Sequence, residues 1–263
     1  MNEGIFIAAS GGMKQQLKLE VISNNLANLN TPGFKKDEIV FESLVLPFFQ
    51  EKHPGNEIPT VLQKSNLNTG GAYVGISGST TDFSQGALVV TTNTLNVALE
   101  GEGFFVIETA EGIRYTRNGS FQLDGLGQLV TKDNHLVLGD TGSPIVMDAQ
   151  GKSITIDADG FISIGNGLGT TPVGKIKLVR FEDHSLMIKE GAGYFRMSDP
   201  DAIEIFPDEV IVRQGFLESS NVQPVEEMIK MIETVRVFEA YQKIIQIIDE
   251  ADNQSISNIS QVA

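Results

Sequence analysis

The chain has 263 residues and a formal net charge of -15, from 34 acidic and 19 basic residues, and it contains no cysteine. This charge would repel a phosphate backbone and argues against nucleic acid and anionic lipid as partners. The lack of cysteine excludes disulfides and thiolate sites, and the lack of an apolar run of about 18 residues argues against membrane insertion.

The N-terminal segment has the three-to-four-residue spacing of an amphipathic helix from Ile5 to about Leu29. Small side chains in Ala8–Gly12 would allow a neighbouring helix to approach closely. Pro32 ends the pattern, because proline disfavours helical geometry at the residue before it. The apolar or small positions of this seam are Ile5, Ala8, Gly12, Leu19, Ile22, Leu26 and Leu29.

The middle of the chain changes character twice. Residues 36–78 carry several prolines without sustained periodicity, which predicts a largely extended connector. In residues 79–213, β-branched residues alternate with other residues, and Gly, Asp and Asn recur at short intervals as turn residues. This pattern predicts an all-β domain whose strands lie outside the N-terminal segment. The predicted strands are Ala87–Thr91, Phe104–Thr109, Leu129–Thr131, Leu136–Leu138, Ser153–Ile156, Phe161–Ile164 and Lys175–Phe181.

A second helix is predicted after Pro224, of about seven turns, with Asn221 as its cap and fraying beyond Asp252. Isolated helices are marginal in water, so each terminal helix needs a partner. We interpret Ile232 and Val235 as part of a stripe that becomes buried between helices on assembly and is mostly unpaired in the free monomer. The stripe is formed by Val225, Met228, Ile229, Ile232, Val235, Phe238, Tyr241, Ile245 and Ile248.

Enzyme signatures fail when they are tested one by one. The three histidines lie far apart in the sequence, which is unlike a metal or acid–base site. Gly101-Glu102-Gly103 lacks the third glycine of a dinucleotide loop. Asp157–Gly160 lacks the terminal acid of a calcium loop and is interpreted as a hairpin turn. We therefore expect no catalytic residue, no cofactor and no metal, and predict that the chain is not an enzyme.

Three blocks of the sequence resemble one protein family. Asn24–Lys36 is similar, almost residue for residue, to the N-terminal motif of flagellar basal-body rod and hook proteins. Leu95–Val106, continued through Tyr115–Phe121, and Gln214–Val222 with the following helix resemble the same family in the same order. Asn96 departs from the pattern, which usually has aspartate there. Within the family, Val173–Val179 and Ser220–Glu226 look more like proximal than distal rod members.

The resemblance implies an α+β fold in which terminal helices flank an all-β central domain and pair in coiled-coil fashion on assembly. The implied domains are an assembly helix with the rod motif (1–35), the connector (36–78), the β domain (79–213) and a second assembly helix (214–263). The residues implied in assembly are Asn25, Leu26, Ala27, Asn28, Thr31, Gly33, Phe34, Ile232, Val235, Arg236 and Phe238.

The resemblance also implies a structural axial subunit of the periplasmic rod of the flagellar basal body. Such a subunit would stack helically with itself and with other rod subunits, after export through the flagellar type III apparatus. We expect no cleaved leader, because the apolar run at Ile5–Ala9 is too short for a signal peptide. The alternative is a soluble scaffold or binding module whose terminal helices pair stably within one monomer.

Overall fold

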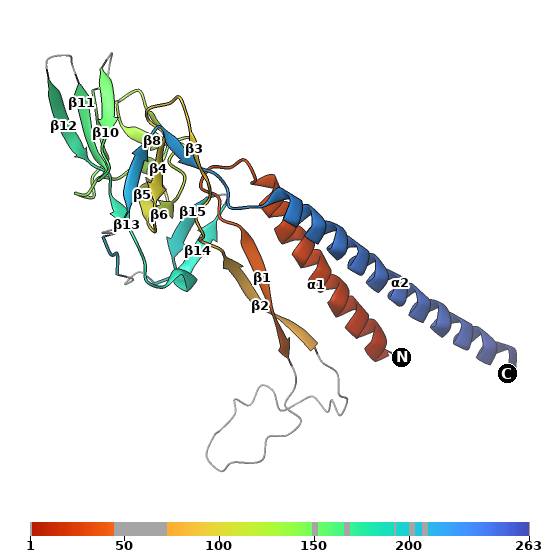
Figure 1. Ribbon diagram of the computed structural model, residues 1–263. Helices are drawn as coiled ribbons and strands as arrows, with labels where there is room; N and C mark the ends of the chain where they lie inside the picture. Colours follow the sequence, from red (N-terminus) through yellow and green to blue (C-terminus); the bar gives the residue numbers. More distant parts are fainter. Residues whose placement is uncertain are drawn as a thin grey trace, which may run out of the picture. The chain divides into compact units, whose positions relative to one another are not determined.

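The computed structural model describes residues 2–44, 73–148, 152–165, 169–191, 193–199, 203–206 and 210–262. Long helices lie at the two ends of the chain and short strands lie between them (Figure 1), as the α+β prediction required. The elements are α1 (Asn2–Ala27), β1 (Asp37–Leu44), β2 (Tyr73–Thr81), β3 (Leu88–Val90), β4 (Val97–Glu100), β5 (Phe104–Thr109), β6 (Gly112–Thr116), β7 (Phe121–Leu123), β8 (Leu129–Thr131), β9 (Leu136–Val137), β10 (Ser153–Ile156), β11 (Phe161–Gly165), β12 (Thr170–Lys175), β13 (Leu178–Val179), the 3-10 helix η2 (His184–Leu186), β14 (Met187–Glu190), β15 (Tyr194–Met197), β16 (Ile211–Gln214), β17 (Phe216–Glu218) and α2 (Pro224–Val262).

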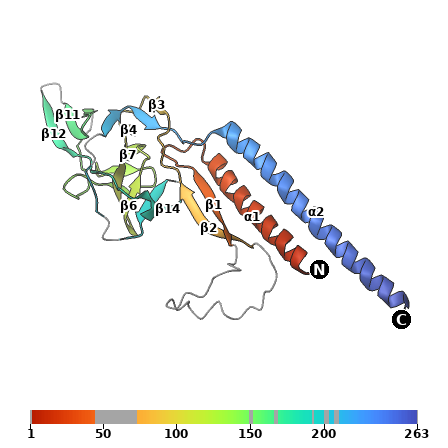
Figure 2. The ribbon, with the colours of Figure 1, turned by 60° about the horizontal axis from the view of Figure 1, so that its bottom comes forward.

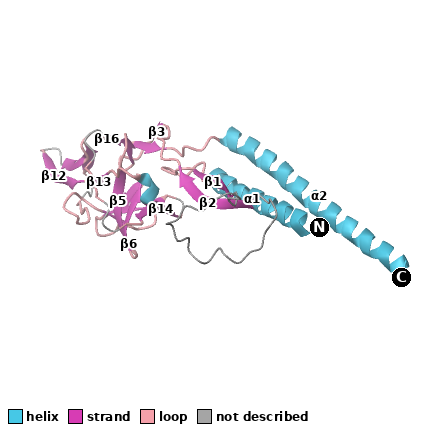
Figure 3. Ribbon diagram, turned by 90° about the horizontal axis from the view of Figure 1, so that it is seen from below, coloured by secondary structure: helices cyan, strands magenta, loops and turns pink. Residues whose placement is uncertain are grey.

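Contacts divide the chain into two compact units. The helical unit consists of Met1–Ser23, Ile39–Ser79 and Met228–Ala263, and the β unit consists of Asn24–Glu38 and Thr80–Glu227. Most of the strands belong to the β unit (Figure 3). The end of α1 and the residues that follow it therefore belong to the β unit.

In the helical unit, α1 and α2 lie side by side and run antiparallel (Figure 2). A Cβ atom placed on Gly4 would lie 3.5 Å from Ile248, and one placed on Gly11 would lie 2.5 Å from the ring of Tyr241. The small residues of α1 thus allow the close approach that the sequence predicted. No helix among the described residues is long and apolar enough to cross a membrane.

The second helix differs from its prediction in length and in its cap. It has 39 residues, or about eleven turns, and continues past Asp252. It begins at Pro224, which suits a first helical position because proline needs no hydrogen-bond acceptor there. The backbone carbonyl that accepts the first bond belongs to Gln223, which receives the amide of Glu227 at 3.0 Å. Asn221 therefore is not the cap.

Alanine substitutions at two neighbouring glycines test the helix pair. Gly12→Ala gains about 1 kcal/mol of helix propensity, and its new Cβ atom meets Phe238 and Tyr241 only at 3.9 Å. Gly11→Ala gains the same propensity but must displace the Tyr241 ring. We expect slower hydrogen exchange of the α1 amides in Gly12→Ala than in Gly11→Ala. Equal protection in the two variants would contradict this packing.

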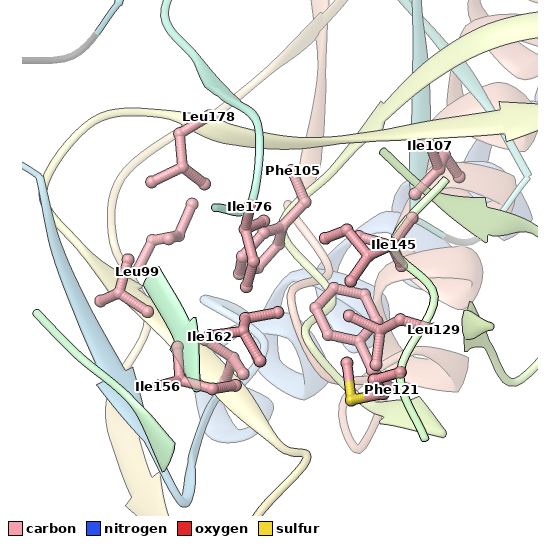
Figure 4. Packing of buried hydrophobic residues seen from close by; sticks show 14 of the residues in the cluster. Leu99, Phe105, Ile107, Phe121, Leu129, Ile145, Ile156, Ile162, Ile176 and Leu178 are labelled. Carbon is pink, nitrogen blue, oxygen red and sulfur yellow. The ribbon is translucent and has the colours of Figure 1, made fainter. Parts of the chain in front are cut away.

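The largest sheet of the β unit has the strand order β14-β15-β6-β5-β9-β8-β7, and β13 pairs with β5 outside this path. Strand β5 is buried on both faces, since all four residues from Phe104 to Ile107 are inaccessible. Phe105 and Ile107 point into one apolar cluster, which Figure 4 shows, and Phe104 and Val106 point into a second cluster. Burial on both faces of β5 explains why all four of these residues are hydrophobic.

The remaining strands form small sheets of two or three. They pair as β10-β11-β12, β16-β4, β17-β3 and β1-β2. The turn predicted at Asp157–Gly160 joins β10 to β11, and the Asp157 carboxylate accepts the amides of Asp159 and Phe161 at 3.0 and 2.8 Å. The strand predicted at Lys175–Phe181 is instead divided between β12 and β13. Strands β1 and β2 lie in the predicted connector, whose centre is outside the described residues.

Candidate assembly site

The motif segment, Asn24–Lys36, begins in the last turn of α1 and is bonded on both sides to other parts of the β unit. The Asn25 side chain is 2% exposed, and its Nδ2 donates to the Asp37 carbonyl at 2.9 Å and to the Glu227 carboxylate at 3.4 Å. Its Oδ1 accepts the Asp37 amide at 3.0 Å. One amide side chain thus joins the end of α1 to the start of β1 and the start of α2.

A turn after α1 redirects the chain. Asn28 Nδ2 donates to the Asn24 carbonyl at 2.9 Å, and Thr31 Oγ1 donates to Asn28 Oδ1 at 3.1 Å, which satisfies groups that the helix end leaves unpaired. Gly33 follows with φ 69° and donates its amide to the Glu218 carbonyl at 2.8 Å. A Cβ atom at Gly33 would lie 2.4 Å from the backbone carbon of Arg117, so only glycine allows this approach.

Phe34, the next residue of the motif segment, is fully buried. The ammonium of Lys189 lies 3.8 Å from the centre of its ring, which is a cation–π contact. The same ammonium donates to the Lys35 carbonyl at 2.6 Å and to the Asp37 carboxylate at 2.8 Å. Burial lowers the pKa of Lys189, and the neighbouring Asp37 carboxylate opposes that shift.

A buried ionic triad holds the next residue of the motif segment. Lys35 Nζ lies 2.6 Å from Glu218 Oε1, and Arg117 Nη1 lies 3.5 Å from Glu218 Oε2. The side chains of Lys35, Glu218 and Arg117 are 1%, 0% and 4% exposed. Burial lowers the pKa of Lys35 and of Arg117, and the Glu218 carboxylate opposes both shifts. Two cations therefore depend on one carboxylate.

Asn221 links the C-terminal segment to the motif segment. Its Oδ1 accepts the Lys36 amide at 2.8 Å, and its Nδ2 donates to the Asp82 carbonyl at 2.8 Å. Its own amide donates to the Phe34 carbonyl at 3.4 Å. These contacts explain why the side chain predicted to cap α2 faces the other way.

The β domain was predicted to begin at residue 79, but the contacts group Asn24–Glu38 with it, and Phe34 and Lys35 are buried in the β unit. Of the predicted assembly residues, Asn25, Gly33 and Phe34 are buried, Leu26, Asn28 and Thr31 are half-buried, and Ala27 is exposed. The contacts of Asn25, Gly33 and Phe34 described above lie within one chain, and a role of this group in assembly stays a prediction.

The predicted residues on α2 occupy different faces of that helix. Phe238 lies beside Gly12 of α1, and Thr234 is buried, so these residues belong to the row that faces α1. Ile232 is 56% exposed and Val235 is 36% exposed in the single chain, so their burial in contacts between helices of an assembly stays a prediction. Arg236 is also exposed.

Sequence reasoning missed Lys35, Arg117, Lys189, Glu218 and Asn221 as members of the site. The positions of Lys35, Arg117, Glu218 and Asn221 within blocks that resemble one family were the only signal that could have pointed to them, and Lys189 lies outside those blocks. Metal chemistry has no support in the described part of the chain, where no three His, Asp or Glu side chains come together as ligands. Within the β unit, the arrangement connects the segment that follows α1 to the segment that precedes α2.

Comparisons with known proteins agree on one family. The family described as "Flagella basal body rod protein" matches residues 5–35, the "Flagellar hook protein FlgE/F/G D1 domain" matches 98–164, and the "Flagellar basal body rod FlgEFG protein C-terminal" matches 213–259.

Similar whole proteins are named as flagellar basal-body rod proteins. The flagellar basal-body rod protein FlgG of Buchnera aphidicola subsp. Schizaphis graminum is 34% identical over 260 residues, covering 95% of this chain and 97% of the relative. FlgF of Caulobacter vibrioides is 31% identical over 262 residues, with 100% of both chains covered. FlgG of Bacillus subtilis is 34% identical over 259 residues, covering 95% of this chain and 96% of the relative.

Proposed function

This chain belongs to the family of flagellar basal-body rod proteins, which are structural proteins and not enzymes, and from that premise we propose that it self-assembles helically through its terminal helices. In this proposal the assembled copies form part of the drive shaft between motor and hook, in the proximal region of the rod. The partners would be further copies of the chain, other rod subunits and, before assembly, the flagellar type III export apparatus.

The observation that carries the proposal is the exposed apolar surface of α2. Met228, Ile229 and Ile232 are each at least 50% exposed in the single chain. Contiguous apolar side chains on an otherwise polar surface mark a contact with another molecule. A contact that repeats head to tail without closing generates a helical filament, which is the geometry a rod needs.

The contacts of the motif segment also support a mechanical role. Through Asn25, Lys35 and Asn221 it ties the end of α1 and the start of α2 to the β unit. Torque that enters at the helices could then pass into the β unit through buried ionic and hydrogen bonds. The predicted assembly residues Asn25 and Phe34 would act here by holding the helix bases in place.

A double substitution on α2 tests the proposal. Ile232→Asp with Val235→Asp puts two carboxylates on an exposed surface, so the monomer should lose no more than about 0.5 kcal/mol per site. If that surface is desolvated in the rod, the same charges cost several kcal/mol there. We expect cells that carry only the variant to be non-motile, while the purified monomer melts as the wild type does.

The matched control is Gln242→Asp with Gln246→Asp, which adds the same charge to exposed polar positions of the same helix. These cells should swim normally. Normal motility of the Ile232/Val235 variant would remove this part of α2 from any assembly contact.

A scaffold with stably paired terminal helices remains the second candidate, and one observation favours it. The contact between Gly11 and Tyr241 lies within a single chain. Pairing within one chain is compatible with rod assembly as well, because it leaves Ile232 exposed. A scaffold would tolerate the double substitution, so the motility test also separates these candidates.

A further inference from the structure

The segment 82–86, which precedes β3, is bonded to both sides of the site within the β unit. The Ser84 carbonyl accepts Lys35 Nζ of the motif segment at 2.7 Å. The Asp82 carbonyl accepts Asn221 Nδ2, from the residues before α2, at 2.8 Å. The position of this short segment therefore affects how firmly the motif segment is attached to the rest of the β unit.

Phe83 is the apolar side chain that holds this segment on the β unit. The centre of its ring lies 5.2 Å from that of Phe195 and 5.7 Å from that of Phe104, and both of these rings are buried. The ring of His184 lies nearer still, at 4.8 Å and tilted by 35°. One member of this aromatic cluster can therefore gain a charge, whereas the three phenylalanines cannot.

The surroundings of His184 favour its neutral form. Burial lowers the pKa of the imidazole, the Glu102 carboxylate opposes that shift, and the Arg117 guanidinium adds to it. Asp183 beside it raises the pKa and Arg180 lowers it. Both carboxylates are exposed, so water screens them, whereas Arg117 is buried. The half-buried imidazole is thus poorly placed to carry a positive charge.

Arg117 already places a buried cation beside the same aromatic cluster. Its guanidinium lies 5.3 Å from the centre of the Phe104 ring, and that ring also contacts His184, at 6.2 Å between centres. Arg117 Nε and Nη1 are buried without a hydrogen-bond partner among the described residues. The buried Glu218 carboxylate beside Arg117 also pairs with Lys35. A proton on His184 would therefore add a third cation where one buried carboxylate already serves two.

We infer that His184 is a pH-sensitive switch that controls how firmly the segment 82–86 is held. The neutral imidazole packs against Phe83 and keeps the segment on the β unit. The charged imidazole moves towards water, Phe83 loses a neighbour, and the bond between Ser84 and Lys35 is weakened. Acid thus loosens the attachment of the motif segment. This inference does not rest on the proposed self-assembly, because every contact that it uses lies within one β unit.

The pH range of the switch follows from the direction of the pKa shift. The ordinary pKa of histidine is 6.5, and that of His184 is lowered in the folded chain. Above about pH 6.5 the imidazole is neutral in both the folded and the unfolded chain, and its proton does not affect stability. Below that pH the unfolded chain binds the proton first, so stability falls until the pH passes the folded pKa. Between pH 7.5 and 5.5, His184 should raise the equilibrium constant for unfolding by up to about tenfold.

Titration of the full chain tests the inference. His184→Phe keeps a ring against Phe83 but cannot take a proton. His135→Phe is the matched control, because His135 also contacts an aromatic ring, that of Tyr194. Nuclear magnetic resonance of the wild-type imidazoles, assigned with these variants, should show His184 titrating below pH 6.5. In urea unfolding, the rise of the unfolding constant from pH 7.5 to 5.5 should be up to about tenfold smaller in His184→Phe than in the wild type.

Hydrogen exchange locates the effect. After correction for the intrinsic pH dependence of exchange, the amides of residues 82–86 should lose protection at pH 5.5 in the wild type and in His135→Phe, but not in His184→Phe. Unchanged protection in the wild type, or an equal loss in His184→Phe, overturns the switch. Titration of His184 at or above pH 6.5 also overturns it, because cation–π attraction to Phe83 would then outweigh burial. That titration is measured on the wild type, so the test does not depend on the folding of any variant.

Discussion

Glu218→Gln should lower the free energy of unfolding of the β unit by about 3–5 kcal/mol, the cost of leaving a buried charge without its partner. The substitution leaves Lys35 and Arg117 buried with no carboxylate, although the glutamine oxygen can still accept the Gly86 amide that Glu218 accepts at 2.8 Å. Urea unfolding followed by tyrosine fluorescence or circular dichroism measures the loss.

Two variants serve as controls for this prediction. Lys35→Met removes one of two cations and leaves the Glu218–Arg117 pair, so it should cost less than Glu218→Gln. Glu100→Gln breaks the exposed Arg213–Glu100 ion pair, where both side chains are nearly half exposed, and should cost under about 1 kcal/mol. Equal losses for Glu218→Gln and Glu100→Gln would show that the triad is not buried in solution.

Gly33→Ala should lower the free energy of unfolding by about 3 kcal/mol or more, because it combines backbone strain with a steric clash. The new Cβ atom would lie 2.4 Å from the backbone carbon of Arg117 and 2.5 Å from the amide nitrogen of Asn118, and neither can move without shifting the chain. The Gly33–Glu218 backbone hydrogen bond of 2.8 Å would be strained at the same time. Urea unfolding and hydrogen exchange of residues after α1 measure the effect.

Gly142→Ala separates strain from collision. Gly142 has φ 76°, close to that of Gly33, but a Cβ atom added to it would meet no other atom within 4 Å. Gly142→Ala should lower the free energy of unfolding only by the cost of the strained backbone conformation, about 1 kcal/mol. Similar losses at the two glycines would mean that the motif segment does not approach Arg117 as closely as the structure indicates.

The helices and the central strand could be predicted from local pattern. The spacing from Ile5 to Leu26 and the stripe after Pro224 have the helical period, and they yielded α1 and α2. The apolar run Phe104–Val106 yielded β5. The small residues around Gly11 correctly predicted close approach of a second helix, because side-chain size alone decides how near two backbones can come.

The ionic triad could not be predicted, because its members are far apart in the sequence. Lys35 and Glu218 are separated by 183 positions, and a lysine in a polar motif ordinarily lies at the surface. Asn221 was interpreted as a cap because Asn before a helix usually serves as one. Here its side-chain oxygen accepts the Lys36 amide of the motif segment instead. Tertiary contacts decided both cases.

Periodicity alone also could not predict which side of α2 contacts α1. The apolar stripe is wider than one contact needs, so the pattern does not tell which part faces α1. Thr234 is buried in that contact while Ile232 is exposed, the reverse of what hydrophobicity alone suggests. A polar residue inside and an apolar residue outside are understandable if the helix has partners on several sides.

Electron cryomicroscopy of purified basal bodies that contain this chain tests the central claim most directly. The account predicts that the chain lies in the rod, with neighbouring copies touching through the exposed surface of α2 that includes Ile232, and with Lys35 still paired to Glu218 inside each copy. Finding the chain outside the rod, or in a rod where Ile232 faces solvent in every copy, would contradict it.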